Sequence, residues 1–413
     1  MRFRWICSLA LVLSTRAAHA DDAIHSLTLD RAVALALAHN PDNQSAAEDV
    51  AIAEGGLRQA HAFANPSVFV GAIGTNLSPL AAPLPNQVGV AWSIPIGGKR
   101  AAGFAIARAD VATAQASRAT ARRQLAFDVQ AKFVGVLLDA AQLDFARSDQ
   151  ADVKETQALQ EIRYKDGKIA YGELLKLRIQ ARAADDLVRQ AELTLATDRA
   201  ELAQLVGNGV LADDFAVVGE LTPPAVDTVP TAAELYARAL ARRSDYQASL
   251  AGERSAAAAV TAARRQPIPD LGASVAYNRV PGEAGAIDLV LSVDVPIFDR
   301  NRGAIDQAQA TRRKAALATA SLQSQLRADA QKAVSAWETA HARLALYDDE
   351  LLAAAKESLD ITQHAYEAGR GSLLDYLDAE TSYRAVTSAY RAAVADAVIA
   401  AAQLRFVAGE DSP

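Results

Sequence analysis

The stretches YKDGKIAYGELL, residues 164–175, and YEAGRGSLLDYL, residues 366–377, are two versions of one turn. Each lies between two long segments with helical periodicity, and its glycine stands where a helix often ends in a left-handed cap. The sequence therefore predicts two helical hairpins, with tips near 164–173 and 366–376. The matching positions share one offset of 202 residues: Tyr164 and Tyr366, Gly167 and Gly369, Leu175 and Leu377.

The rest of the chain is duplicated in the same order. FANPSVFVGA from Phe63 corresponds to QPIPDLGASVAY from Gln266, and VAWSIPIGGKRAAG from Val90 corresponds to VLSVDVPIFDRNRG from Val290. Each half predicts a helix, two strands, a very long helix, a turn and a long helix. We expect a first repeat at 21–207, a linker without periodicity at 208–230 and a second repeat at 231–413.

Three segments alternate apolar residues with small or polar ones: 86–96, 270–278 and 286–297. A fourth expected strand, 66–75, alternates less cleanly, because Gly71 and Gly74 weaken it. A half-buried soluble sheet has this alternation, and so does a transmembrane barrel with lipid outside and water inside. A tilted β-strand of about ten residues is long enough to cross a bilayer. The side chains expected on the lipid side are Val88, Val90, Trp92, Ile94, Leu271, Val275, Tyr277, Ile287, Leu289, Leu291 and Val293.

Four strands are too few to enclose water. In lipid, the outer edges of such a sheet would leave backbone groups without hydrogen bonds, at a cost of several kcal/mol each. If these strands lie in a membrane, several copies of the chain must therefore share one barrel.

The segment after each strand pair has helical periodicity for more than sixty residues. Between Gly303 and Tyr366 no proline or glycine interrupts it, so we expect one continuous helix there. Apolar residues follow heptad spacing, as in a coiled coil: Leu322, Leu326, Ala330, Ala333, Trp337, Ala340, Leu344, Tyr347 and Leu351. The helices alone are equally consistent with a soluble periplasmic coiled-coil scaffold or adaptor.

The first twenty residues have the features of a secretory signal peptide. Arg2 and Arg4 precede a short apolar run, and residues 18–20, Ala-His-Ala, form a cleavage motif. Cys7, the single cysteine, lies inside this segment, so the mature chain is expected to have no disulfide, thiolate nucleophile or cysteine metal ligand. No later run of about 18 apolar residues occurs, so no transmembrane helix is expected.

Motifs for enzymatic chemistry are not found. The histidines beyond the signal segment are scattered, with no H-x-x-x-H spacing, so neither a dedicated metal site nor a cofactor is expected. GGKR at 97–100 lacks the other residues of a phosphate loop, and no G-x-S-x-G occurs. The net charge of −7 gives no sign of nucleic-acid binding. We therefore expect that the protein is not an enzyme. Any transport through it must then be driven by a partner protein.

Three segments resemble the TolC-type outer-membrane efflux channel family, the outer membrane factors. LTLDRAVALALAHNP at 27–41 resembles the family's opening helix, VPIFDRNRG at 295–303 its strand-to-helix junction, and YEAGRGSLLDYLDAE at 366–380 its periplasmic tip. The resemblance implies a mainly α fold with a trimeric, twelve-stranded barrel continued by a helical periplasmic tunnel. It also implies an outer-membrane location, a periplasmic adaptor (membrane fusion protein) and an inner-membrane RND-type pump.

The motif PIFDRNRG looks most similar to the heavy-metal, CzcC-like branch of this family. That similarity implies export of cations such as Co, Zn, Cd, Ni or Cu. A drug or small-molecule duct of the same family is the alternative. The resemblance further implies that Asp375 and Asp378 narrow the periplasmic aperture, paired with Arg370 or Lys168; the alternative is solvated acids that complement a helix dipole. It places the adaptor contacts at the two tips: Gly167, Lys168, Ile169 and Ala170, with Gly369, Arg370, Gly371 and Ser372.

Overall fold

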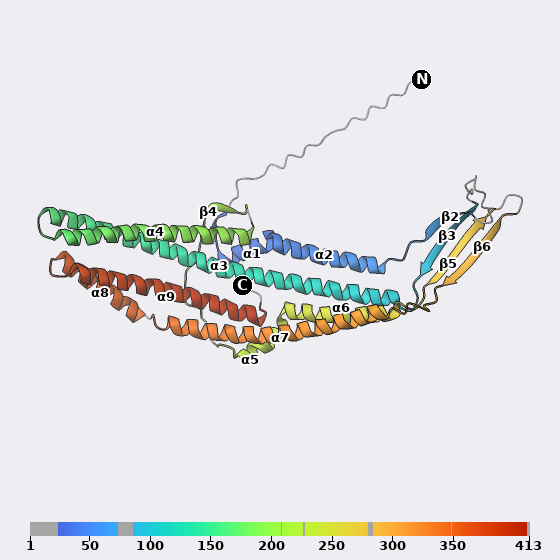
Figure 1. Ribbon diagram of the computed structural model, residues 1–413. Coiled ribbons are helices and arrows are strands. Elements are labelled where there is room, and N and C mark those ends of the chain that lie inside the picture. Colours follow the sequence, from blue (N-terminus) through green and yellow to red (C-terminus); the bar gives the residue numbers. More distant parts are fainter. Residues whose placement is uncertain are drawn as a thin grey trace, which may run out of the picture.

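The computed structural model describes residues 24–72, 86–207, 209–225, 228–279, 284–347 and 349–410. The molecule is elongated, with a small sheet at one end and two helical hairpins at the other (Figure 1). The two repeats run side by side along its length. The expected signal segment with Cys7, the last residues of the first expected strand (73–75) and the loop at 76–85 lie outside the described residues.

The sheet contains four antiparallel strands in the order β2-β3-β5-β6. Each repeat forms one hairpin, as predicted, and β3 pairs with β5 to join the repeats. Within the described residues, β2 and β6 are the outer edges of this sheet. The strands are β2 (Ser67–Gly71), β3 (Gln87–Ile94), β5 (Leu271–Asn278) and β6 (Ala286–Val293).

The expected end of the last strand near 297 was wrong, because β6 ends at Val293. Val293 pairs with Leu271, the first residue of β5, so residues 294–297 extend beyond the partner strand. The chain turns there, because Ile297 donates its amide to the carbonyl of Val295 at 2.9 Å instead of to a neighbouring strand.

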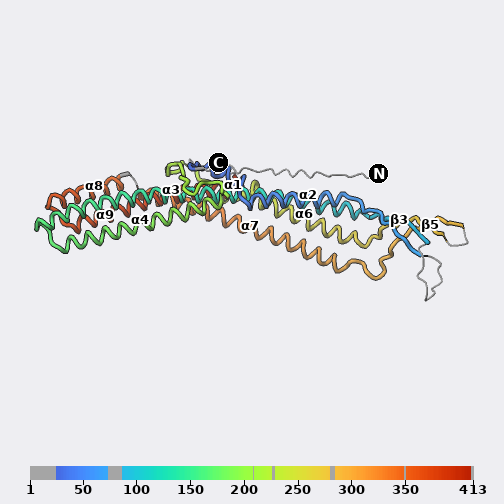
Figure 2. The backbone as a smooth tube through the Cα atoms, turned by 90° about the horizontal axis from the view of Figure 1, so that it is seen from above, coloured from blue at the N-terminus to red at the C-terminus, as the bar shows by residue number. Residues whose placement is uncertain are grey.

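Four helices continue from the sheet in the same lateral order as the strands: α2 with α3, α3 with α6, and α6 with α7 (Figure 2). Asn40 caps α2 by accepting from the amides of Asp42 and Asn43, with Pro41 at the first helical position. The helices are α2 (Pro41–His61), α3 (Lys99–Lys165), α6 (Ser244–Arg265) and α7 (Arg302–Leu344).

The far half consists of α3 paired with α4 (Tyr171–Val206), and α8 (Asp349–Glu367) paired with α9 (Leu373–Ala408). The heptad positions are buried where α7 packs against α9, which confirms this part of the predicted seam: Leu326, Ala330, Ala333, Trp337 and Ala340. In the first repeat α3 runs unbroken for 67 residues, about 100 Å.

The expected continuous helix from 303 to 366 was wrong. It ends at Leu344 and restarts at Asp349, although no proline or glycine intervenes. Leu346 donates its amide to the carbonyl of Arg343, an i→i+3 bond that tightens and closes the last turn. Glu350 lies in the first turn of α8, where an acidic residue favours a helix start because of the helix dipole. This acid was a sequence signal for the break.

The middle of the molecule contains α1 (Leu29–His39), α5 (Ala232–Arg242) and a two-stranded parallel sheet. That sheet pairs β1 (Ile24–Leu27) with β4 (Leu211–Val217), so part of the expected linker at 208–230 is a strand. Leu27 and Phe215 are fully buried there.

One described helix, α9, is long and apolar enough by length and composition to cross a membrane, unlike the expectation drawn from apolar runs. Its most apolar window is 44% buried within the chain. A core helix passes the same test, and α9 packs against α3 and α7.

Candidate functional site

The two helical tips have the same backbone hydrogen bonds. Gly167 donates to Tyr164 O at 2.9 Å and Lys168 to Arg163 O at 2.9 Å, while in the second tip the equivalent bonds are 3.0 and 2.9 Å long. Gly167 and Gly369 both have φ of 71°, so each adopts the left-handed conformation expected of a helix cap.

Most of the predicted adaptor contacts are solvent-exposed, whereas Ile169 and Gly371 are half-buried. A Cβ at Gly371 would lie 2.9 Å from Tyr366 N, so this glycine is needed for close packing of the second turn. Ser372 Oγ accepts from Leu374 N at 3.1 Å and caps α9, while Ala170, at the equivalent position, gives α4 no side-chain cap.

The two tips are tied together by Arg163 at the end of α3. Its guanidinium donates to the carbonyls of Tyr366, at 3.4 Å, and of Glu367, in the last turn of α8. Tyr366 and Tyr376 stack with ring centroids 5.8 Å apart and are buried with Leu177 of α4. The second tip is therefore held against the first by one charge-assisted contact and a small apolar cluster.

Asp375 and Asp378, the expected aperture residues, lie in the first two turns of α9 and are exposed. Within the described part of the chain neither has an ion pair, whereas Lys168, one expected partner, pairs with Asp166 at 3.2 Å. Both aspartates are free to meet cations or another protein copy at this end of the molecule.

A network of buried charged groups lies about 10 Å along α9 from its start. Glu380 is only 4% exposed and receives a 3.5 Å hydrogen bond from Gln180 of α4. Arg384 lies 3.8 Å from Glu380 and donates to Asp149 of α3 at 3.1 Å. Burial, followed by the negative charge of Asp149, raises the pKa of Glu380 to about 7, although Arg384 opposes the shift. The guanidinium of Arg384 thus interacts with two carboxylates, Glu380 on α9 and Asp149 on α3. Gln180 connects Glu380 to the third helix, α4.

At the other end of the molecule, the apolar residues of the four strands share one face. Val90 lies between Val68 of β2 and Val275 of β5, and Val275 lies opposite Leu289 of β6. Directly paired residues in an antiparallel sheet project to the same side. Of the eleven residues expected to face lipid, Ile94 and Leu271 are half-buried, and the other nine are exposed on this band.

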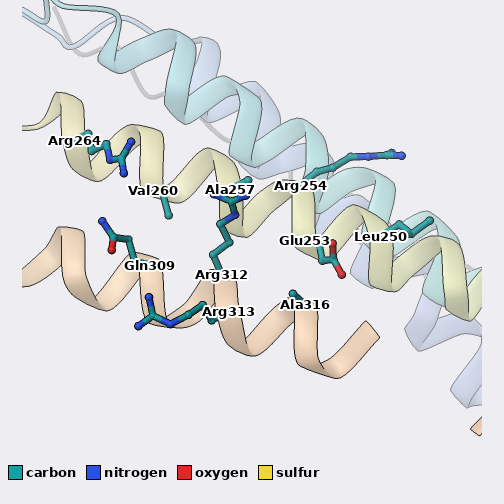
Figure 3. A pocket seen from close by; sticks show the side chains of 10 residues that line it. All are labelled: Leu250, Glu253, Arg254, Ala257, Val260, Arg264, Gln309, Arg312, Arg313 and Ala316. Carbon is teal, nitrogen blue, oxygen red and sulfur yellow. The ribbon is translucent and has the colours of Figure 1, made fainter. Parts of the chain in front are cut away.

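A cavity of about 660 Å³ lies between α6 and α7 below the sheet (Figure 3). Four arginines line it together with one acid, Glu253, so its electrostatics favour anions over metal cations. The arginines are Arg254, Arg264, Arg312 and Arg313. Within the described ranges, no three His, Cys, Asp or Glu side chains form a group that could hold a metal ion.

Sequence reasoning missed Arg163, the Glu380 network and the arginine-lined cavity. The pairs RR at 264–265 and 312–313 were a visible signal for the cavity, since both fall on helices of the same region. Nothing local marked Arg163, because its acceptors are more than 200 residues away in sequence. Arg384 lies four residues after Glu380, but Gln180 and Asp149, which complete the network, lie on other helices.

Comparisons with known proteins agree with this architecture. The family model described as "Outer membrane efflux protein" matches residues 32–208 and 235–410, one match for each repeat. The cobalt-zinc-cadmium resistance protein CzcC of Cupriavidus metallidurans is 28% identical over 370 residues, covering 87% of this chain and 84% of CzcC.

Solved structures share the fold. A membrane protein from Pseudomonas aeruginosa superposes with a TM-score of 0.79 at 20% identity, over 92% of this chain and 90% of that one. The CmeC outer membrane channel of Campylobacter jejuni gives 0.77 at 16% identity, over 93% and 87%. With both repeats matched, this chain belongs to the outer membrane efflux protein family, the TolC-type channels that its tips and junctions resemble.

Proposed function

We propose that this protein is the passive outer-membrane duct of a tripartite efflux system, assembled as a homotrimer. Its strands pool into a twelve-stranded barrel in outer-membrane lipid, and its helices form a periplasmic tunnel. A periplasmic adaptor docks at the tips and delivers substrate from an inner-membrane pump of the RND type. Efflux channels conduct rather than catalyse, so the energy comes from the pump.

The observation that carries this proposal is the apolar band on a sheet with two open edges. Nine of the eleven side chains predicted to face lipid are exposed in the single chain, and β2 and β6 have no outer partner within the described residues. A soluble protein would leave a large apolar patch in water, which favours association or membrane burial. Membership of the efflux family leaves the soluble scaffold without support.

We further propose heavy-metal cations of the Co, Zn, Cd, Ni and Cu class as substrate. The support is the similarity to CzcC, a protein named for cobalt, zinc and cadmium resistance, over most of both chains. A drug duct of the same family remains the second candidate, because relatives of similar fold at 16–20% identity differ widely in sequence.

Growth of a strain lacking this gene tests the function and the substrate together. Metal export predicts that the strain loses resistance to one or more of the five metal salts, with resistance to a drug panel unchanged, and that the wild-type gene restores growth. Sensitivity to drugs alone would instead identify a drug duct. Unchanged resistance to both would contradict an efflux role.

The aperture is tested by the double variant Asp375→Ala and Asp378→Ala. If these exposed acids narrow the tunnel mouth, removing both should raise single-channel conductance in planar bilayers and weaken block by divalent cations. The matched control is Glu350→Ala with Glu357→Ala, which removes two exposed acids of α8. Conductance equal to that of the control would dismiss the aperture role.

A further inference from the structure

The arginine-lined cavity lies where α6 and α7 are hydrogen-bonded to each other above and below it. On the side toward the sheet, the side-chain amide of Asn301 donates to the carbonyl of Ala263 at 2.8 Å. On the far side, the hydroxyl groups of Ser249 and Thr319 lie 2.7 Å apart. Between these two contacts no hydrogen bond joins the two helices within the described residues, and the cavity of about 660 Å³ lies there.

Two arginines extend toward each other inside this cavity, because α6 runs toward the sheet and α7 runs away from it. Arg264 follows Ala263, at the upper contact, and Arg312 lies 11 positions after Asn301, about 16 Å further from the sheet. Helical side chains tilt toward the N-terminus of their own helix, so Arg264 tilts away from the sheet and Arg312 toward it. Figure 3 shows Arg312 extending toward α6 and Arg264 leaving α6 on the side that faces α7.

The arginines around the cavity have no charge partner within the described chain. Arg254, Arg264, Arg312 and Arg313 form no hydrogen bond or ion pair there, and the one acid among the lining residues is Glu253. Positive charge is therefore in excess around an open space. Guanidinium groups around one space repel one another, and an anion between them would relieve that repulsion.

The first repeat shows that the fold does not require these arginines. A shift of 203 positions relates the helix starts of the two repeats: Pro41 with Ser244 for α2 and α6, and Lys99 with Arg302 for α3 and α7. The same helix pair thus forms in both repeats, but only the second has the arginine cluster. The positions in the first repeat that are equivalent to the four arginines are Ala51, His61, Ala109 and Asp110.

We propose that this cavity binds an anion that carries phosphate groups, held between Arg264 and Arg312. A guanidinium group donates two parallel hydrogen bonds to a phosphate, which makes arginine the side chain best suited to this recognition. Two arginines at separate heights fit a ligand with two phosphate groups better than a single phosphate ion. The volume of the cavity lies within the range of small-molecule sites, about 300–1,000 Å³.

Two sources supply this chemistry, a phospholipid headgroup and a soluble phosphate ester. Arg264 lies seven positions before Leu271, where β5 begins, so the upper end of the cavity is close to the sheet. With the sheet in lipid, as proposed above, this end lies near the headgroups of the periplasmic leaflet. Basic pockets between helices at such a level bind cardiolipin, a lipid with two phosphates. Only the lipid source rests on the proposed function; phosphate binding by the arginines does not.

Binding to the purified, delipidated protein tests the site with two probes. Native mass spectrometry follows the binding of cardiolipin from detergent micelles. Calorimetry follows the binding of glycerol 1,3-bisphosphate, the cardiolipin headgroup without its acyl chains. We expect the wild type to bind at least one of the two probes, and the variant Arg264→Gln with Arg312→Gln to bind it at least about tenfold more weakly, because charge-assisted hydrogen bonds are lost.

The matched control is Arg58→Gln with Arg122→Gln, which removes two exposed arginines from α2 and α3 of the first repeat. Its affinity should stay within about twofold of the wild type, because neither side chain lines the cavity. A second cavity variant, Arg264→Lys with Arg312→Lys, keeps the charge but loses the paired hydrogen bonds. It should also bind more weakly than the control, and it replaces the glutamine variant if that one does not fold.

The two probes also distinguish the two sources. Binding of cardiolipin alone would identify a membrane lipid as the ligand, and binding of glycerol 1,3-bisphosphate alone would identify a soluble phosphate ester. Binding of both would show that the headgroup is sufficient for recognition. No binding of either probe, or an equal loss of affinity in the control, would overturn the phosphate site. The efflux function would be unaffected by that result, because growth on metal salts and drugs tests it separately.

Discussion

Glu380 shows how a single residue can carry a pH response in this fold. Its side chain is buried among α3, α4 and α9, and its pKa is raised to about 7, first by burial and then by Asp149. The folded state therefore binds a proton more tightly than the unfolded state does. This contribution to stability is fully present below the ordinary glutamate pKa near 4.5 and is lost as the pH rises through about 7.

The variant Glu380→Gln should remove this dependence, because glutamine keeps the shape and cannot ionise. We expect the thermal midpoint of the wild type to fall relative to that of the variant between about pH 5 and pH 8. Calorimetry at several pH values measures the difference, with the exposed-site variant Glu357→Gln as control. Parallel profiles for wild type and Glu380→Gln would show that the carboxylate is already ionised at pH 5.

At the scale of elements, each tip is a helix-turn-helix whose geometry depends on one left-handed glycine. No atom lies within 4 Å of a Cβ added at Gly167 or Gly369, so alanine there meets no steric obstacle. The remaining penalty is the left-handed backbone, about 1–2 kcal/mol for a residue with a Cβ.

We therefore expect Gly369→Ala to speed amide hydrogen exchange at the second tip by at least fivefold, the factor that corresponds to about 1 kcal/mol. Exchange followed by mass spectrometry measures it. Gly172, on α4 with open space and an ordinary φ, provides the control, and its alanine variant should leave exchange unchanged or slow it. Equal exchange in both variants would mean that the turn does not need its left-handed glycine.

The tips also show how far local sequence reaches. Their position, their glycines and their shared form followed from an internal repeat, since helix termination is local chemistry. Arg163 did not, because its acceptors are the backbone carbonyls of Tyr366 and Glu367 on another hairpin. An acidic residue, Glu350, marked the break between α7 and α8 in the sequence. The continuous helical periodicity nevertheless led to the prediction of one unbroken helix.

At the scale of the whole molecule, function depends on surfaces that a single copy leaves unfinished. Within the described residues, the sheet at one end has an apolar face and two unpaired edges, and exposed acids and glycine turns lie at the other end. A small sheet buries too little to be stable alone in water or lipid. Such a sheet needs assembly with further copies, as in the proposed twelve-stranded barrel.

The sequence by itself determined the duplication, the strand and helix periods, the faces of the strands and the positions of the tips. These are local properties, because side-chain direction repeats every two residues in a strand and about every 3.6 in a helix. The tertiary structure alone decided that β3 pairs with β5, that β6 stops at Val293 and that Glu380 shares Arg384 with Asp149. Each of these three features joins segments that are distant in sequence or depends on which neighbouring segment is present. The periodicity of the sequence carries no information about such long-range contacts.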